Sequence, residues 1–164
     1  MKKLLILLIG LYLGGCHQTP PSKTGLEGKP LPSFDFLLLD SSTYVNSTKL
    51  SADKPIVFFY FSPHCPYCRA LTHEIVNRDK VLKEIQFVLL TPSSISEVTK
   101  FYNYYKLEKY KNIITAFDYK NSFANHFKTT QVPFLLIYNK QRILKLLHLG
   151  TMPTSEIKSY ALSK

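Results

Sequence analysis

The chain has 164 residues, of which 45% are hydrophobic, 13% aromatic and 20% charged, and its net charge is +10. This length fits a single domain, and the aromatic content excludes a disordered or collagen-like chain. Three cysteines are too few for a disulfide-stapled miniprotein or for a four-cysteine zinc site. The lysines are scattered and no nucleic-acid-binding motif accompanies them, so we expect no nucleic-acid partner.

The first residues predict a targeting segment. Lys2-Lys3 precedes the apolar run 4–13, and Gly14-Gly15-Cys16 follows it. A basic start and about ten apolar residues are typical of a secretory signal peptide. The run is well short of the ~20 residues that a membrane-spanning helix needs. A buried core helix is the alternative, but the leading lysines and the Gly-Gly-Cys end disfavour it.

The end of this segment, Leu13-Gly14-Gly15-Cys16, resembles the lipobox of bacterial lipoproteins. The resemblance implies that residues 1–15 are removed and that Cys16 carries acyl chains, which would anchor the protein in a bilayer. Residues 16–32 contain four prolines and two glycines, so we expect a lipidated cysteine and a flexible tether there. Residues 33–164 are then the folded domain.

Strands and helices alternate in the predicted domain. Strands are expected at 34–40, 44–45, 56–61, 87–90, 113–117, 134–138 and 143–149, and helices from Pro66, after Ser94 or Ser96, at 121–127 and after Pro153. The run at 56–61, IVFFYF, has the composition of a strand that is buried on both faces. This alternation predicts an α/β fold with a mixed sheet, parallel in its centre, with helices on both faces and a late antiparallel hairpin.

The motif Cys65-Pro66-Tyr67-Cys68 lies where a buried strand gives way to a helix, the context in which C-x-x-C indicates redox chemistry. Unpaired N–H groups and the positive end of the helix dipole favour a negative charge on Cys65. Cys68 follows one helical turn later, close enough to attack a mixed disulfide on Cys65. Pro66 fits the first helical turn without losing a hydrogen bond.

Two other interpretations of the cysteines stay open at this point. A structural disulfide between them would close a minimal loop and add little stability through chain entropy. A metal site would need His64 and His73 as further ligands, but His73 lies about two turns along the predicted helix and should point away. We therefore assign no metal ligands.

The C-x-x-C helix and a second motif together resemble the thioredoxin superfamily. The second motif is Thr130-Gln131-Val132-Pro133, followed by the predicted strand 134–138. In that superfamily a cis proline before this strand faces the two cysteines and helps to hold an extended substrate. The resemblance therefore implies a cis Val132–Pro133 bond, with both residues binding substrate. An ordinary proline at the start of a strand is the alternative.

Residues 28–160 resemble the membrane-tethered TlpA/ResA-like branch, whose members have redoxin domains. Segment 28–34 resembles the beginning of such domains, extra strands precede the thioredoxin core, and residues 84–117 supply a central insertion. The resemblance implies no bound cofactor, because the Cys65–Cys68 pair itself carries the two electrons as a dithiol and gives them up on forming its disulfide. It also implies thiols and disulfides of cell-envelope proteins as substrates, and a membrane or periplasmic redox partner.

The sequence departs from this family pattern around the cysteines. Phe59 stands where thioredoxin has a buried aspartate, and His64 stands where a tryptophan is common. ResA-like proteins often have a glutamate where this chain has Leu71. Glu74 and Asp118 are candidates for the acid that exchanges a proton with Cys68, and each is expected to be a solvated carboxylate. His64 is a candidate modulator, because an imidazolium beside Cys65 would favour its thiolate.

The sequence thus predicts a lipid-anchored, extracytoplasmic thiol–disulfide oxidoreductase that faces the periplasm or the exterior. One alternative is a peroxiredoxin-like peroxidase, for which Ser62 fits the pattern, whereas Phe58 occupies the position of the required proline. Another alternative is a non-enzymatic copper chaperone, since two thiolates suit Cu(I). The direction of disulfide exchange depends on the reduction potential of the pair.

Overall fold

The computed structural model describes residues 24–163, which form seven strands, five α-helices and two short 3-10 helices. The strands are β1 (Asp35–Leu38), β2 (Tyr44–Asn46), β3 (Ile56–Tyr60), β4 (Gln86–Thr91), β5 (Ile113–Phe117), β6 (Phe134–Tyr138) and β7 (Leu144–Leu149). The α-helices are α1 (Pro66–Asn77), α2 (Asp79–Leu82), α3 (Ile95–Tyr105), α4 (Ser122–Phe127) and α5 (Thr154–Leu162), and the 3-10 helices are η1 (Ser47–Lys49) and η2 (Leu107–Lys109). No helix among the described residues is long and apolar enough to cross a membrane.

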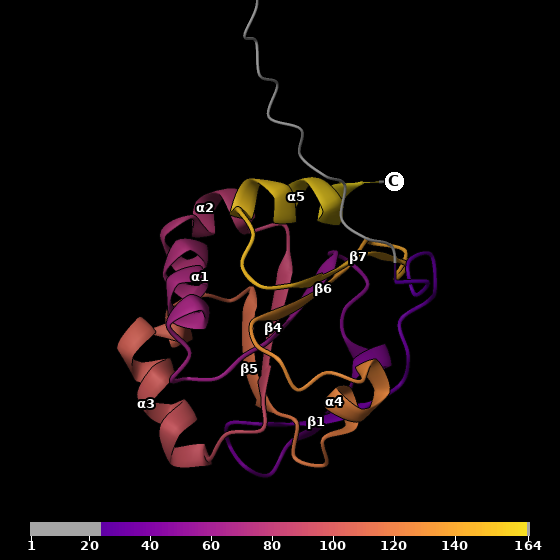
Figure 1. The fold of residues 1–164 in the computed structure, drawn as a ribbon. Helices are drawn as coiled ribbons and strands as arrows, with labels where there is room; N and C mark the ends of the chain where they lie inside the picture. Colours follow the sequence, from indigo (N-terminus) through magenta and orange to yellow (C-terminus); the bar gives the residue numbers. More distant parts are fainter. Residues whose placement is uncertain (1–23, 164) are drawn as a thin grey trace, which may run out of the picture.

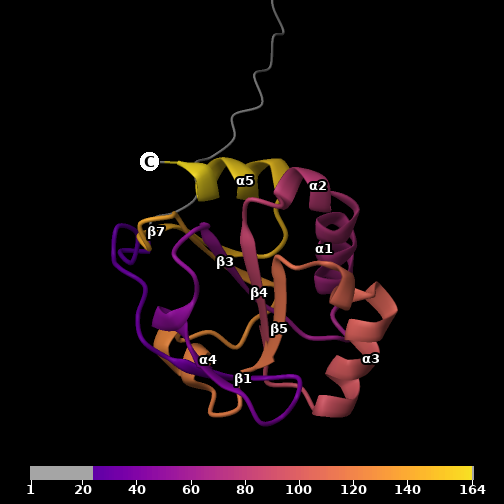
Figure 2. The same ribbon diagram turned by 180° about the vertical axis from the view of Figure 1, so that it is seen from behind.

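The strands form one mixed sheet in the order β2-β1-β5-β4-β3-β6-β7. β3, β4 and β5 are parallel, whereas β6 is antiparallel to β3 and β7 is antiparallel to β6. Figures 1 and 2 show the molecule from opposite sides. The predicted fold class is confirmed, including the extra strands β1 and β2 before the core. The predicted insertion, 84–117, contains α3 and β5, and β5 separates β1 from β4.

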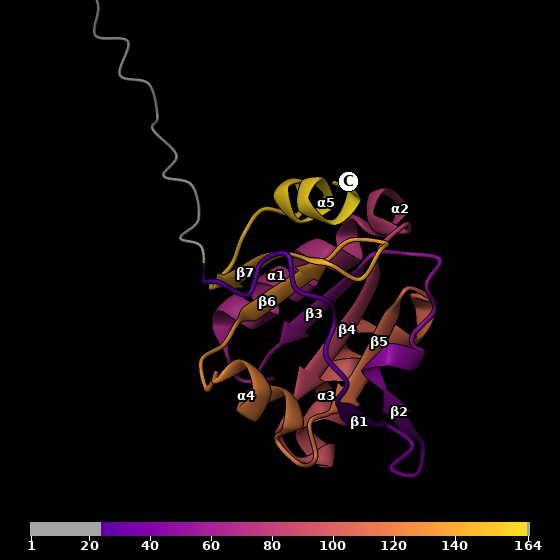
Figure 3. The ribbon, with the colours of Figure 1, turned by 90° about the vertical axis from the view of Figure 1, so that its right-hand side faces the viewer.

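Helices cover both faces of the sheet, because its central strands are apolar on both sides. All five residues of β3 and all five of β6 are buried. On one face α1, α3 and α5 pack through residues such as Leu71, Phe101 and Ile157. On the other face α4 packs through Phe123 and Phe127. In Figure 1, α1 and α3 lie on one side of β4 and β5 and α4 lies on the other, and Figure 3 shows the strands side by side.

The fold begins earlier in the chain than the predicted boundary at residue 33. Gly28 N–H donates to Leu144 O at 2.8 Å, and Leu144 N–H donates to Lys29 O at 2.9 Å. The side chains of Leu26 and Leu31 also pack against the core on the α4 face. The predicted tether at 16–32 is therefore wrong for its last residues, which line the edge of β7. The remainder of the tether, including Cys16, and the predicted signal peptide lie outside the described residues.

Candidate active site

Cys65 is the N-cap of α1 and is half-buried. Its sulfur accepts a hydrogen bond from the N–H of Cys68 at 3.4 Å, and Pro66 occupies the first helical position. This N–H belongs to the set that no carbonyl of the helix can satisfy, so it is available to a negative sulfur. The predicted helix start is confirmed, and it places the Cys65 sulfur against a free N–H group of the first helical turn.

Cys68 lies one turn along α1 on the buried face. Its side chain is 0% exposed and packs with Leu71 and Ile75 in the core. Burial raises the pKa of the Cys68 thiol, with smaller contributions from neighbouring groups. Both cysteines are free thiols in the structure. The pair therefore combines one accessible sulfur with one that external reagents cannot easily reach.

The loop before β6 lies against Cys65. The Val132–Pro133 peptide bond is cis, as predicted from the superfamily resemblance. The Cys65 thiol donates a weak hydrogen bond to the carbonyl oxygen of Val132, with 3.9 Å between Sγ and oxygen. Cys65 and Val132 are 67 positions apart in the chain, and the fold brings them together at the carboxyl end of β3. Here α1 begins and the loop before β6 passes.

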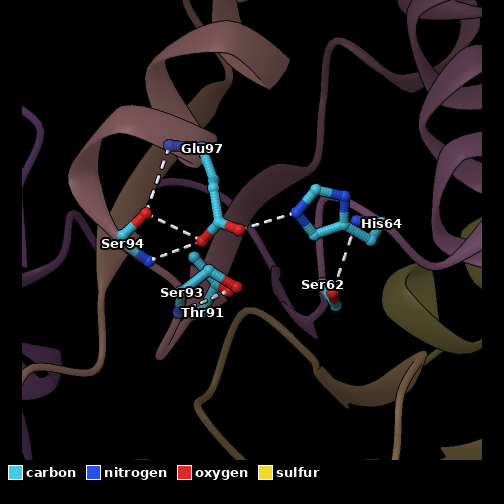
Figure 4. A network of polar contacts seen from close by, with 6 residues as sticks. All are labelled: Ser62, His64, Thr91, Ser93, Ser94 and Glu97. Atoms are coloured by element: carbon cyan, nitrogen blue, oxygen red, sulfur yellow. Dashed lines mark hydrogen bonds and ion pairs between the residues drawn. The ribbon is translucent and has the colours of Figure 1, made fainter.

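His64, the candidate modulator, is bound to a residue that the sequence analysis missed. Its Nε2 lies 2.7 Å from Glu97 Oε1, and its backbone N–H donates to Ser62 Oγ. Glu97 also completes a capping box on α3, since its Oε2 accepts from the N–H and hydroxyl of Ser94. Figure 4 shows the imidazole directed at Glu97.

Both oxygens of the Glu97 carboxylate are therefore occupied. The hydrogen bond from His64, followed by those from Ser94, lowers the pKa of Glu97 to about 2. The carboxylate is fixed on the first turn of α3, and it ties the loop that precedes Cys65 to that helix. The Ser-x-x-Glu spacing at 94–97 was the available signal for the capping box, but nothing in the sequence indicated contact with His64, 33 residues earlier.

Neither candidate acid contacts Cys68. Glu74 accepts hydrogen bonds from the N–H and hydroxyl of Thr154 at the start of α5, and it forms an ion pair with Arg78. Asp118 was expected to be solvated, and this is wrong because it is only 2% exposed. Its two oxygens accept the N–H groups of Phe123 and Ala124, so it caps α4 on the opposite face of the sheet.

Asp118 also affects a neighbouring phenol. Burial, together with the charge and hydrogen bond of Asp118, raises the pKa of Tyr60 at the end of β3. Asp118 and Glu74 therefore hold helices in place, and the structure gives neither of them a proton-transfer contact with the cysteines. His73, the other residue considered as a metal ligand, contacts Asn77 on α1. Within residues 24–163 no three His, Cys, Asp or Glu side chains form a group that could hold a metal ion.

Two surface pockets meet at Val132, beside Cys65. The first, here called the α4 pocket, has a volume of about 640 Å³ and is lined by Tyr60, Phe61, Ser62, Pro92, Ser93, Asn121, Ala124, Asn125, Lys128, Thr129, Thr130 and Val132. The second, here called the Tyr67 pocket, has about 460 Å³ and is lined by Tyr67, Gln131, Val132, Pro133, Leu149, Gly150 and Thr151. An extended segment that reached Cys65 would therefore find open surface on both sides of Val132.

Comparison with known proteins identifies the family of this fold and site. The Redoxin family matches residues 26–161. A comparison with curated proteins finds no significant match. Three similar solved structures are dsbF of Mycobacterium tuberculosis, a secreted M. tuberculosis disulfide oxidoreductase homologous to E. coli DsbE, and StoA of Bacillus subtilis.

The likeness to these structures is one of fold, since sequence identities are low. For dsbF the identity is 21%, covering 78% of this chain and 92% of that one, with a TM-score of 0.66. The secreted oxidoreductase is 17% identical, with 78% and 93% coverage and a TM-score of 0.65. StoA is 12% identical, with 81% and 98% coverage and a TM-score of 0.60. The chain belongs to the Redoxin family within the thioredoxin superfamily, and its fold is that of thiol–disulfide oxidoreductases.

Proposed function

We propose that this protein exchanges disulfides with protein substrates in the cell envelope through Cys65 and Cys68. The observation that carries the proposal is the asymmetry of the pair beside the Val132–Pro133 loop. Cys65 is accessible at the start of α1 and contacts Val132, whereas Cys68 is fully buried one turn away. Exchange in two steps needs one sulfur that meets the substrate and one that is kept for the second step.

In the reductive direction, the Cys65 thiolate attacks one sulfur of a substrate disulfide and the other substrate sulfur leaves as a thiolate. Cys68 then attacks the Cys65 sulfur, which releases the second substrate thiolate and leaves a Cys65–Cys68 disulfide. Two electrons pass from the dithiol to the substrate, and the proton of Cys68 goes to solvent. The oxidative direction is the reverse sequence. The backbone around Val132 is placed to hold the substrate segment, as in strand addition.

Reduction of insulin tests this chemistry. With dithiothreitol as the electron donor, we expect the protein to accelerate the precipitation of insulin chains. Cys65→Ser should reduce the rate to that of dithiothreitol alone, because the attacking sulfur is lost. Consumption of hydrogen peroxide, measured on the same sample, addresses the peroxidase alternative. Rapid peroxide consumption without insulin reduction would contradict the proposal.

We also propose that Cys16 is lipidated and that it anchors the domain to a bacterial membrane, with the active site in the periplasm or outside the cell. The lipobox-like Leu13-Gly14-Gly15-Cys16 after a signal-like segment supports this. We expect mass spectrometry of the membrane fraction to find acyl chains on Cys16 and no residues 1–15. Cys16→Ser should move the protein out of that fraction. A mature protein that retains Met1 would contradict the anchor, although not the redox chemistry.

A further inference from the structure

The lining of the α4 pocket, which includes the Cys65 contact residue Val132, carries one charge, and that charge is positive. Lys128 is the only charged residue among those that line it. Lys128 is exposed and ends α4, four residues before Val132. Neither its ammonium group nor the side chains of Asn125 and Thr130 has a hydrogen-bond or ion-pair partner within residues 24–163. The pocket therefore presents a cation and unpaired polar donors to whatever occupies it.

The surface on the other side of Val132 has a different character. No charged residue lines the Tyr67 pocket, and its two large apolar side chains are well exposed, Tyr67 at 66% and Leu149 at 50%. Val132 lines both pockets and contacts Cys65. A substrate segment that crosses Val132 therefore has the charged α4 pocket on one side of its cysteine and the uncharged Tyr67 pocket on the other.

We propose that the α4 pocket selects protein substrates with an acidic residue close to the reacting cysteine, and that Lys128 determines this specificity. The inference rests on the proposed disulfide exchange and names the substrates that this site prefers. In an extended segment, residues one or two positions from the cysteine lie about 3–7 Å along the chain. Val132 contacts Cys65 and also lines the pocket, so a residue at that spacing from the substrate cysteine can enter the pocket. The long and flexible side chain of Lys128 can then move to meet it.

The charges around the pocket favour a carboxylate as its occupant. Lys128 supplies the positive charge, and the amide of Asn125 and the hydroxyl of Thr130 can donate to carboxylate oxygens. Asp118 is buried on this face and bonds the lining residue Tyr60, but it does not itself line the pocket, and the N–H groups of Phe123 and Ala124 satisfy its oxygens. A basic substrate residue would meet Lys128 without a compensating carboxylate among the lining residues.

Peptides that differ in one charge test the proposal. Each peptide contains a single cysteine in a mixed disulfide with thionitrobenzoate, and Asp, Asn or Lys is placed one or two positions before or after it. The Cys65 thiolate attacks the peptide sulfur and the coloured thionitrobenzoate leaves. Cys68 then attacks the Cys65 sulfur and releases the peptide thiolate. The reduced protein supplies both electrons, so the rate of colour release in one turnover reports the attack by Cys65.

At one or more of the four placements, we expect the Asp peptide to react about two- to fivefold faster than the Asn peptide, which is the range for a partly exposed ion pair. The Lys peptide should react more slowly than the Asn peptide. Lys128→Ala should bring the Asp and Asn rates together, and Lys128→Glu should reverse the order of the Asp and Lys peptides. The preference should weaken in high salt.

A lysine far from the pocket provides the matched control. Lys111 is exposed just before β5, at the end of the sheet opposite Cys65, and Lys111→Glu changes the net charge by the same amount. The inference is overturned if Lys111→Glu changes the relative rates of the Asp and Lys peptides as much as Lys128→Glu does. It is also overturned if, at every placement, the native protein reacts no faster with the Asp peptide or Lys128→Glu does not reverse that difference in rate. If no peptide reacts faster with the native protein than with Cys65→Ser, the proposed function itself fails.

Discussion

Replacing Cys68 by serine is expected to convert the catalyst into a trap for its substrates. Cys65 would still attack a disulfide, but the sulfur that resolves the product would be missing. External thiols at about millimolar concentration cannot match a neighbouring thiol, since well-oriented groups reach effective molarities of ~10⁵ M or more. Mixed disulfides should therefore persist for much longer than in the native protein.

The measurement is non-reducing electrophoresis of cell envelopes after acid quenching and alkylation. Cys68→Ser should give covalent complexes that dithiothreitol dissolves. Cys65→Ser is the matched control, and it should give none because Cys68 is fully buried and the sulfur of Cys16 is blocked by the proposed acyl chain. Equal trapping by the two variants would show that the roles assigned to the cysteines are wrong.

Phe123→Ala is expected to lower the free energy of unfolding by about 3–5 kcal/mol. Phe123 is 0% exposed, and its ring lies 5.0 Å from that of Tyr60 and 5.5 Å from that of Phe34, between centroids. It also contacts Phe127 on its own helix and Phe134 at the start of β6. Alanine would leave a cavity beneath α4, the helix that leads into the Val132 loop.

Urea unfolding of the purified variants measures this effect. Val81→Ala is the control, because Val81 is 53% exposed on α2 and a surface substitution changes stability by only about 0.5 kcal/mol. A cost for Phe123→Ala as small as that of the control would contradict the packing of α4 on the sheet. Insulin reduction at a temperature where the variant remains folded should also fall, since the loop that positions substrate follows α4 directly.

The features that could be predicted from the sequence are those that local patterns determine. The strand at 56–61 was evident because an unbroken apolar run fits a strand buried on both faces. The start of α1 was evident because Pro66 and the spacing of Cys65 and Cys68 reflect interactions within a single turn. The cis Val132–Pro133 bond came from a family resemblance rather than from any local pattern.

The features that the sequence did not reveal depend on contacts between distant segments. Glu97 meets His64 only because α3 begins beside the end of β3. Asp118 was expected in solvent, because nothing local shows that α4 folds back over its carboxylate. Gly28 and Lys29 were assigned to a tether on composition, yet their backbone groups bind Leu144, more than 100 positions away. Lys128 was one scattered lysine among many until the fold placed it beside Val132.

The central claim is that Cys65 is the sulfur that meets the substrate and that Cys68 resolves the product. It is tested most directly by rapid acid quenching of the native reduced protein after mixing with a peptide disulfide, followed by digestion without reduction and mass mapping. We predict that the peptide appears first on Cys65 and that the Cys65–Cys68 disulfide replaces this adduct. A peptide attached first to Cys68, or a Cys65–Cys68 disulfide that forms with no preceding adduct on Cys65, would contradict the account.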